Sequence, residues 1–244
     1  MISTLERSND RKVANAVKVS AKGVASPRIK NAWGMLAGPN GSCTDATKFC
    51  IAHCYAGEES NGSEKIFPSV KALVTRNYEA MRDATLDEQV IMLGTMIADF
   101  SAECEKYSAP KLFRIHWDGD FFSATYTAAW ARVIKAHADV QFWAYTRVAR
   151  SALFLTAQKL GNLSLYFSAD EDNVTLVPAM QAKGINIAYV APTFSEAKQA
   201  LPSGTRCPEN NRAIALISDK GSACQRCGLC IKGRGDVLFS TTKK

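Results

Sequence analysis

Residues 112–120 read Leu-Phe-Arg-Ile-His-Trp-Asp-Gly-Asp, a short apolar run that ends in two carboxylates flanking a glycine. The run is rich in apolar and aromatic residues and too short for a typical helix, so it predicts a buried strand. Five more runs of this kind recur along the chain, separated by longer stretches with apolar residues at helical spacing. Strands that alternate with helices are typical of α/β proteins, in which right-handed crossovers join parallel strands.

The expected strands are 32–37, 112–117, 140–146, 163–168, 185–190 and 213–218, and the expected helices are 67–82, 86–107, 123–137, 149–160, 174–183 and 195–201. About six βα units make either a doubly wound sheet or a partial (β/α) barrel. We predict the partial barrel over residues 31–204, between a basic N-terminal segment 1–30 and a cysteine-rich, metal-binding knuckle in residues 205–244. The tail after Lys232 is expected to be ordered in part and then to fray.

Polar residues follow the predicted strands, where both candidate folds place their functional sites. Asp118 and Asp120 are the strongest candidates, because paired carboxylates beside the flexible Gly119 suit an ammonium group, a metal or a sugar hydroxyl. Asp120 has an alternative role as the cap of the helix that begins near Ser123.

His116 and Arg147 complete the candidate catalytic residues. His116 is as well explained by a hydrogen-bonded core histidine as by a proton carrier. Arg147 either binds a carboxylate or phosphate or pairs with one of the two aspartates. Ser168 and Asp170 follow the fourth strand at the same edge of the predicted sheet.

Seven of the eight cysteines fall into two groups. The first group is Cys43, Cys50 and Cys54, and the second is Cys207, Cys224, Cys227 and Cys230. Close spacing lets one turn of backbone direct several thiolates at one metal centre. The remaining cysteine, Cys104, is expected to be an ordinary helix residue.

The ligand counts differ between the groups. Three thiolates leave one iron of a [4Fe-4S] cluster open to substrate, so the first group predicts a catalytic cluster. Four thiolates in the second group suit a second cluster or a closed zinc site. One cluster shared by both groups is a further alternative.

Composition sets the remaining limits. With 244 residues, 47% hydrophobic and 22% charged, the chain is expected to be globular, and no apolar run approaches the roughly 18 residues of a membrane span. The N-terminal residues lack the apolar core of a signal peptide, which favours the cytoplasm, where thiols stay reduced. The net charge of +7 divides into +5 in residues 1–30, +5 in residues 205–244 and −3 between them. Basic ends indicate contact with a polyanion such as nucleic acid.

Several of these stretches resemble the phage gene product 88 family, a group of phage and plasmid proteins of unassigned activity. The resemblance covers roughly residues 30–232. It rests on residues 32–55, Phe-Arg-Ile-His-Trp-Asp-Gly-Asp-Phe-Phe, Phe-Trp-Ala-Tyr-Thr-Arg, Leu-Ser-Leu-Tyr-Phe-Ser-Ala-Asp and the closing Cys-Pro with Cys-x2-Cys-x2-Cys. It implies a phage-type protein that works in the cytosol of a host cell.

A more distant likeness is to radical S-adenosylmethionine enzymes, partial barrels with three cluster-binding cysteines after the first strand. It implies that the first cysteine group binds a cluster and that Asp118-Gly119-Asp120 holds the amino group of S-adenosylmethionine. Ser168 and Asp170 would contact its ribose. The spacing departs from that family, being Cys-x6-Cys-x3-Cys instead of Cys-x3-Cys-x2-Cys, with His53 where an aromatic residue is usual. The cluster is therefore a firmer expectation than the cosubstrate.

Two hypotheses of function follow. The leading one is a redox or radical enzyme, an oxidoreductase or transferase, with an iron–sulfur cluster at the barrel mouth and an unidentified small-molecule or nucleic-acid substrate. The alternative is a zinc-stabilised nucleic-acid-binding protein that grips phosphates with its basic ends. Iron content distinguishes the two.

Overall fold

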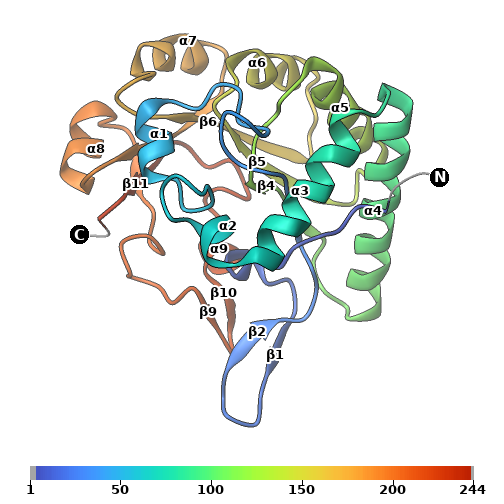
Figure 1. Ribbon diagram of the computed structural model, residues 1–244. Coiled ribbons are helices and arrows are strands. Elements are labelled where there is room, and N and C mark those ends of the chain that lie inside the picture. Colours follow the sequence, from blue (N-terminus) through green and yellow to red (C-terminus); the bar gives the residue numbers. More distant parts are fainter. Residues whose placement is uncertain (1–3, 243–244) are drawn as a thin grey trace.

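The computed structural model describes residues 4–242 and contains one large sheet of seven parallel strands (Figure 1). Its order is β3 (Ala32–Gly34), β4 (Leu112–Asp118), β5 (Gln141–Thr146), β6 (Leu163–Ala169), β7 (Asn186–Ala191), β11 (Val237–Ser240) and β8 (Thr205–Arg206). The first five strands follow chain order, so successive crossovers proceed in one direction along the sheet. The described strands do not close into a barrel, because β3 and β8 remain as edges.

Six of the helices in residues 4–242 connect and cover the strands of the large sheet. They are α3 (Pro68–Arg82), α4 (Leu86–Lys106), α5 (Ala124–Ala136), α6 (Ala149–Ala157), α7 (Val177–Ala182) and α8 (Phe194–Ala200). Local sequence explains several helix starts. Thr85 with Glu88, and Thr193 with Glu196, form capping boxes at the starts of α4 and α8, which satisfy backbone N–H groups that have no partner inside the helix.

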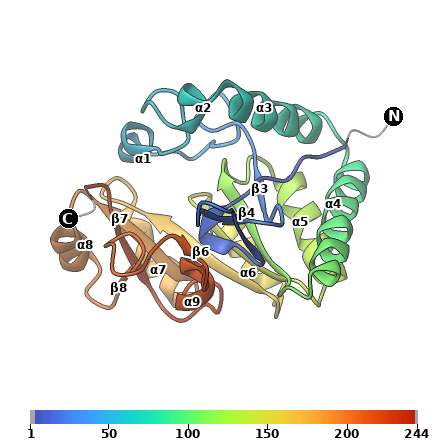
Figure 2. The same ribbon diagram turned by 90° about the horizontal axis from the view of Figure 1, so that it is seen from below.

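Short elements complete the chain. They are η1 (Arg11–Val13), β1 (Val17–Val19), β2 (Ala25–Pro27), α1 (Lys48–His53), α2 (Ser63–Ile66), η2 (Val174–Leu176), β9 (Ile217–Ser218), β10 (Gly221–Ser222) and α9 (Ala223–Cys227). Figure 2 shows α1, α2 and α3 as a layer on one side of the strands, with α4 to α8 around the other sides. No helix in residues 4–242 is both long and apolar enough to cross a bilayer.

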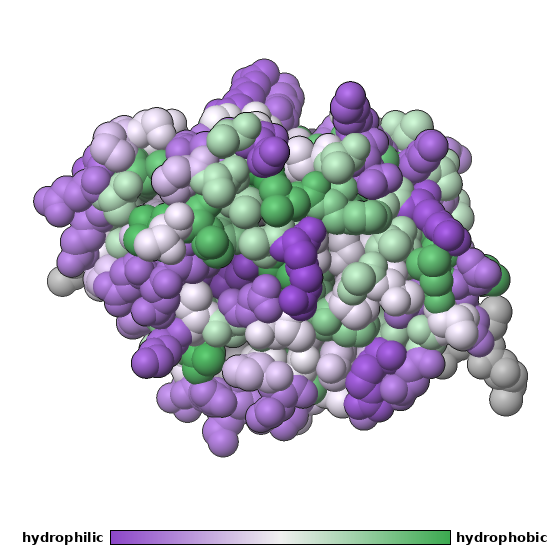
Figure 3. Space-filling view, turned by 90° about the horizontal axis from the view of Figure 1, so that it is seen from above, coloured by the Kyte–Doolittle hydropathy of each residue, from purple (hydrophilic) through white to green (hydrophobic). Residues whose placement is uncertain are grey.

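The two faces of the sheet bury different side chains, because strand residues alternate in direction. On the helix-covered face, Phe113 and Phe142 pack against Trp130 of α5 in a core that also contains Cys104. On the opposite face, Trp143 and Tyr166 pack against η1 and the segment that carries the second cysteine group. The upper surface, where α6 and α7 lie in Figure 1, shows hydrophobic residues bordered by hydrophilic ones (Figure 3).

Five of the six predicted strands and all predicted helices are present, with shifts of a few residues at their ends. The predicted strand 213–218 is wrong as a member of the sheet. Only Ile217–Ser218 is extended there, and it pairs with Gly221–Ser222 in a separate hairpin. The sheet position is filled by β11, which lies in the tail that was expected to fray. Parallel pairing with β7 and β8 on its two sides orders the tail as far as Ser240.

Candidate functional site

A cavity of about 600 Å³ opens at the carboxyl ends of the central strands. Its walls include six of the seven grouped cysteines, namely Cys43, Cys50, Cys54, Cys207, Cys224 and Cys230. The predicted rim residues His116, Asp118, Gly119, Asp120, Arg147 and Ser168 line the same space. Tertiary structure therefore brings together two cysteine groups that are more than 150 residues apart in sequence.

Helix α1 connects the first cysteine group to the loop that follows β6. The Thr47 side chain accepts a hydrogen bond from the backbone N–H of Cys50 at 3.0 Å and donates one to the Asp170 carboxylate at 2.6 Å. The carboxylate of Asp172 accepts from the backbone N–H of Phe49 at 2.8 Å. Thr47 thus caps α1, and the loop after β6 supports the first turn of this helix, which contains Cys50 and is followed directly by Cys54.

Arg147 links this helix to the sheet. Its guanidinium forms an ion pair with Asp170, which is fully buried, so Arg147 pairs with a different aspartate from the two expected. Burial raises the pKa of the Cys50 thiol, while the neighbouring Arg147 charge acts in the opposite direction. A fixed cation beside Cys50 favours the thiolate form, which is the form that binds metal.

Asp120 is held by hydrogen bonds from the next strand. Its carboxylate accepts from the Thr146 hydroxyl at 2.6 Å and from the backbone N–H groups of Arg147 and Phe121 at 2.8 and 2.7 Å. Burial nevertheless raises its pKa. Helix α5 is capped by Ser123 and not by Asp120, so the alternative capping role is wrong. These contacts make Asp120 a brace between the ends of β4 and β5.

Asp118 has a different environment. It is 3% exposed, and neither carboxylate oxygen has a well-formed hydrogen bond from the described residues. Burial and the adjacent Glu64 carboxyl raise its pKa well above the ordinary value. A buried carboxylate without donors is costly. A cationic or hydrogen-donating ligand in the cavity would therefore stabilise Asp118.

His116 borders the cavity, but its imidazole ring points into the helix-covered core. Its backbone φ of 58° interrupts the alternation of β4, and its ring lies 4.5 Å from that of Phe121. The Nε2 atom lies 2.9 Å from the Tyr126 hydroxyl. Burial lowers the pKa of His116 to about 3, so the imidazole is neutral at physiological pH. These contacts favour the core-histidine alternative over the proton carrier.

Gly119 and Ser168 have clear positions in the cavity wall. Gly119 has a φ of +82°, and a Cβ atom at this position would lie 2.4 Å from the Ser42 hydroxyl oxygen. Only glycine fits between β4 and the loop that leads to Cys43. Ser168 lines the cavity, whereas Asp170 is occupied by Arg147 and Thr47.

The second cysteine group lies against the cavity face of the sheet, which is the face opposite the helix-covered core. Ser164 of β6 donates a hydrogen bond to the Ile231 carbonyl at 2.7 Å, and Tyr166 donates one to the Leu229 carbonyl at 3.3 Å. Burial raises the pKa of the Cys230 thiol to about 11, while a hydrogen bond with Tyr145 acts in the opposite direction. This segment is thus attached to strand side chains.

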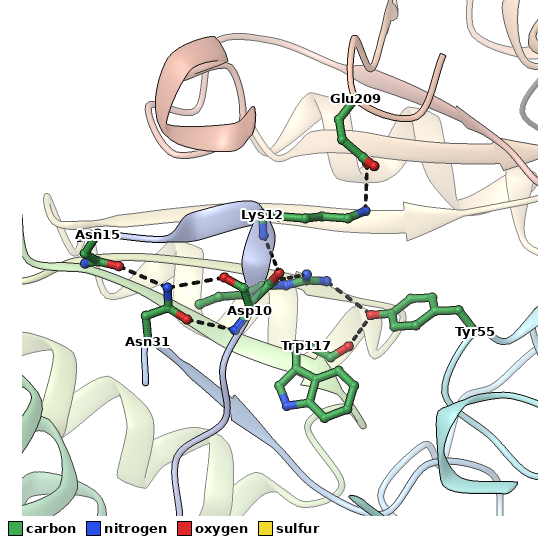
Figure 4. A network of polar contacts seen from close by, with 8 residues as sticks. Asp10, Lys12, Asn15, Asn31, Tyr55, Trp117 and Glu209 are labelled. Carbon is green, nitrogen blue, oxygen red and sulfur yellow. Dashed lines mark hydrogen bonds and ion pairs between the residues drawn. The ribbon is translucent and has the colours of Figure 1, made fainter. Parts of the chain in front are cut away.

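A polar network that was not predicted from the sequence links the N-terminal segment to β4, Tyr55 and Glu209 (Figure 4). Arg114 forms an ion pair with Asp10 at 2.5 Å, and Lys12 forms one with Glu209 at 3.0 Å. The Tyr55 hydroxyl accepts a hydrogen bond from Arg114 at 3.2 Å and donates one to the Trp117 carbonyl. One feature of the sequence could have indicated this network. Arg114 alternates with Phe113 and Ile115 in β4, which places it on the cavity face.

The thiols of both groups are candidate metal ligands. All eight cysteines are free. Within residues 4–242, no three His, Cys, Asp or Glu side chains are grouped closely enough to hold a metal ion as they stand. Metal binding by either group would require its thiols to move closer together. The donor set suits iron or zinc, since it consists of thiolates on short loops and one-turn helices.

Fold and site together define an α/β protein with an open parallel sheet and a cysteine-lined cavity at its carboxyl edge. The model of the family described as Gene product 88 matches residues 3–233, and the chain belongs to this family. It is 57% identical over 244 residues to the Gene 88 protein of Mycobacterium phage D29, with both chains covered completely. It is 55% identical over 243 residues to the Gene 88 protein of Mycobacterium phage L5, again over the full length of both. No solved structure matches the chain.

Proposed function

We propose that the protein is an iron–sulfur enzyme of redox or radical type, with a [4Fe-4S] cluster on Cys43, Cys50 and Cys54. One observation carries the proposal. Free cysteines from two distant segments line a single cavity at the edge of a parallel sheet where α/β enzymes have their active sites. Packing alone does not require six thiols around one cavity.

Three features of the first group support a catalytic role. The group supplies three thiols, which leaves one iron of a four-iron cluster open. Asp170 and Asp172 hold the helix that carries Cys50, so the ligands have a fixed support. The Arg147 guanidinium beside Cys50 balances part of the negative charge that thiolates bring into the cavity.

Asp118 is the residue we assign to substrate or cosubstrate binding. Its buried carboxylate lacks donors and faces the cavity, and the ammonium group of S-adenosylmethionine supplies such donors. Ser168 lines the same cavity and is available to a ribose hydroxyl. The cluster, when bound, supplies single electrons, and the chain's own residues bind, orient and shield the substrate. In this proposal the open sheet takes the place of the partial (β/α) barrel of radical S-adenosylmethionine enzymes.

The second group has a structural role in the proposal. Cys207, Cys224, Cys227 and Cys230 hold either a second cluster or zinc, which fastens the C-terminal segment over the sheet. A single cluster shared by both groups is the alternative that their common cavity favours. The site of action is the cytosol of the host cell, where thiols remain reduced.

Purification without oxygen tests the proposal. Iron-replete protein is expected to be brown and to contain iron and acid-labile sulfide, with about four irons for each cluster. Replacement of Cys50 by serine should remove the iron of the first group, and Cys104→Ala is the matched control because that thiol lies in the helix-covered core. Stoichiometric zinc without sulfide in such material would reject the iron–sulfur proposal and support the zinc-stabilised alternative.

A further inference from the structure

Two β-hairpins lie side by side at the end of the molecule furthest from α6 and α7 (Figure 1). The longer one pairs β1 with β2 and is closed by a hydrogen bond from the Ser20 backbone N–H to the Val24 carbonyl at 3.0 Å. It projects from the body of the protein, and β2 contacts β9 of the shorter hairpin. The fold thus joins the two basic ends of the chain in one surface.

Three exposed lysines of this surface make no ion pair within the described residues. Residues 11–30 contain six basic and no acidic side chains. Lys12 and Lys30 are paired with glutamates. In contrast, Lys18, Lys22 and Lys220 are exposed and make no ion pair with any residue between 4 and 242. The positive charge of the hairpins is therefore available to a partner.

The projecting hairpin also exposes apolar side chains. Val19 is 52% exposed and Val24 is 64% exposed, and they flank the turn that contains Lys22. Val19 ends β1 and Val24 directly precedes β2, and burial of both side chains by a partner is favourable because it removes apolar surface from water. Lysines beside exposed valines indicate a partner that presents both negative charge and an apolar surface.

We propose that the β1–β2 hairpin, with the β9–β10 hairpin beside it, binds duplex DNA. The major groove is about 12 Å wide and admits a two-stranded β-ribbon, and thymine methyl groups in that groove offer apolar contacts. Lys18, Lys22 and Lys220 contact phosphates on the flanking backbone, and Val19 and Val24 enter the groove. This surface is separate from the cysteine-lined cavity, so the proposal does not depend on the iron–sulfur chemistry.

The test measures binding of the full-length protein to a mixed-sequence duplex at several salt concentrations. Each lost phosphate contact reduces the log–log salt slope by about 0.9. The Lys18→Ala, Lys22→Ala, Lys220→Ala triple variant should therefore lose about 2 to 3 units of slope and bind at least about tenfold more weakly at low salt. Val19→Ser with Val24→Ser should weaken binding while leaving the slope unchanged.

Matched controls keep the outcome interpretable. Lys135, Lys159 and Lys183 are exposed and make no ion pair with described residues. Lys135 lies in α5, and the other two lie within two residues of the ends of α6 and α7. Their triple alanine variant should bind DNA like the parent protein, and all variants should keep the parent Tm. Equal slopes for both triple variants would overturn the proposal. So would an absence of binding at low salt, or tighter binding to anionic lipid vesicles than to duplex DNA.

Discussion

The helix-covered face of the sheet buries Phe113, Phe142 and Trp130, whereas the cavity face buries Arg114, Tyr145 and Cys230. The first face is held by close packing of apolar side chains. An empty cavity there is destabilising, but no side chain needs a specific polar partner. The second is held by ion pairs, hydrogen bonds and thiols that need defined partners. The helix-covered face stabilises the fold, whereas the cavity face both stabilises the fold and supplies the candidate functional groups.

The largest effect should come from the second cysteine group. With metal bound, Cys227→Ser should lower the apparent free energy of unfolding by on the order of 10 kcal/mol, because a closed thiolate site exists only in the folded chain. Cys50→Ser should lose the cavity iron and keep the fold, since the packed helix-covered core does not need that metal. Melting temperature and iron content of both variants decide the point. Unfolding of the Cys50 variant together with a stable Cys227 variant would reverse the two roles.

The helix-covered face should show a large effect that is independent of metal. Trp130 is fully buried between Tyr126 and Phe142. Trp130→Ala should destabilise the protein by about 3 to 5 kcal/mol through the cavity that it creates. Chemical denaturation measures the loss, and iron per folded molecule should stay at the parent value. Loss of iron from folded variant protein would show that the two faces are coupled.

A somewhat smaller loss is expected from the ion pair on the cavity face. Asp10→Asn leaves the largely buried Arg114 without its counter-ion and should cost about 3 kcal/mol. The control is Asp83→Asn, which breaks the exposed pair with Arg82 and should change stability little. Denaturation curves at neutral pH compare the two. Equal losses would mean that burial of the Arg114 pair does not matter.

The smallest predicted effect is a pH dependence from His116. Its folded-state pKa of about 3 lies below the ordinary 6.5, so the unfolded chain binds a proton in this interval that the folded chain does not. Stability from the neutral histidine is complete above pH 6.5 and falls by about 2 kcal/mol by pH 5. His116→Phe should remove that part of the decline. Identical pH profiles for the parent and the variant would place His116 outside the core.

Local sequence predicted most of the secondary structure. Thr85 and Glu88 indicate the start of α4, and the alternation in Leu-Phe-Arg-Ile indicates β4. Both signals are local, because capping and side-chain direction depend on residues that are close in sequence. This dependence on nearby residues also explains the strand that was predicted wrongly. Residues 213–218 look like a strand, but β11 occupies the place beside β7, a choice that depends on packing across the sheet.

The site shows the same limit. Spacing identified both cysteine groups, and the polar residue after each strand indicated one functional edge. Sequence could not reveal that Asp120 braces Arg147 and Thr146, that Asp118 lacks donors, or that Arg147 pairs with Asp170. Each of these facts depends on which loops meet at the edge.

Residue type and spacing are enough to indicate the alternating strands and helices, the two groups of thiols and the basic ends. Tertiary structure alone decided that both cysteine groups face one cavity, that His116 points into the core, and that the basic ends meet in adjacent hairpins. The physical reason is that long-range contacts are fixed by burial and pairing across the whole chain, and no local pattern encodes which distant partner satisfies a given side chain.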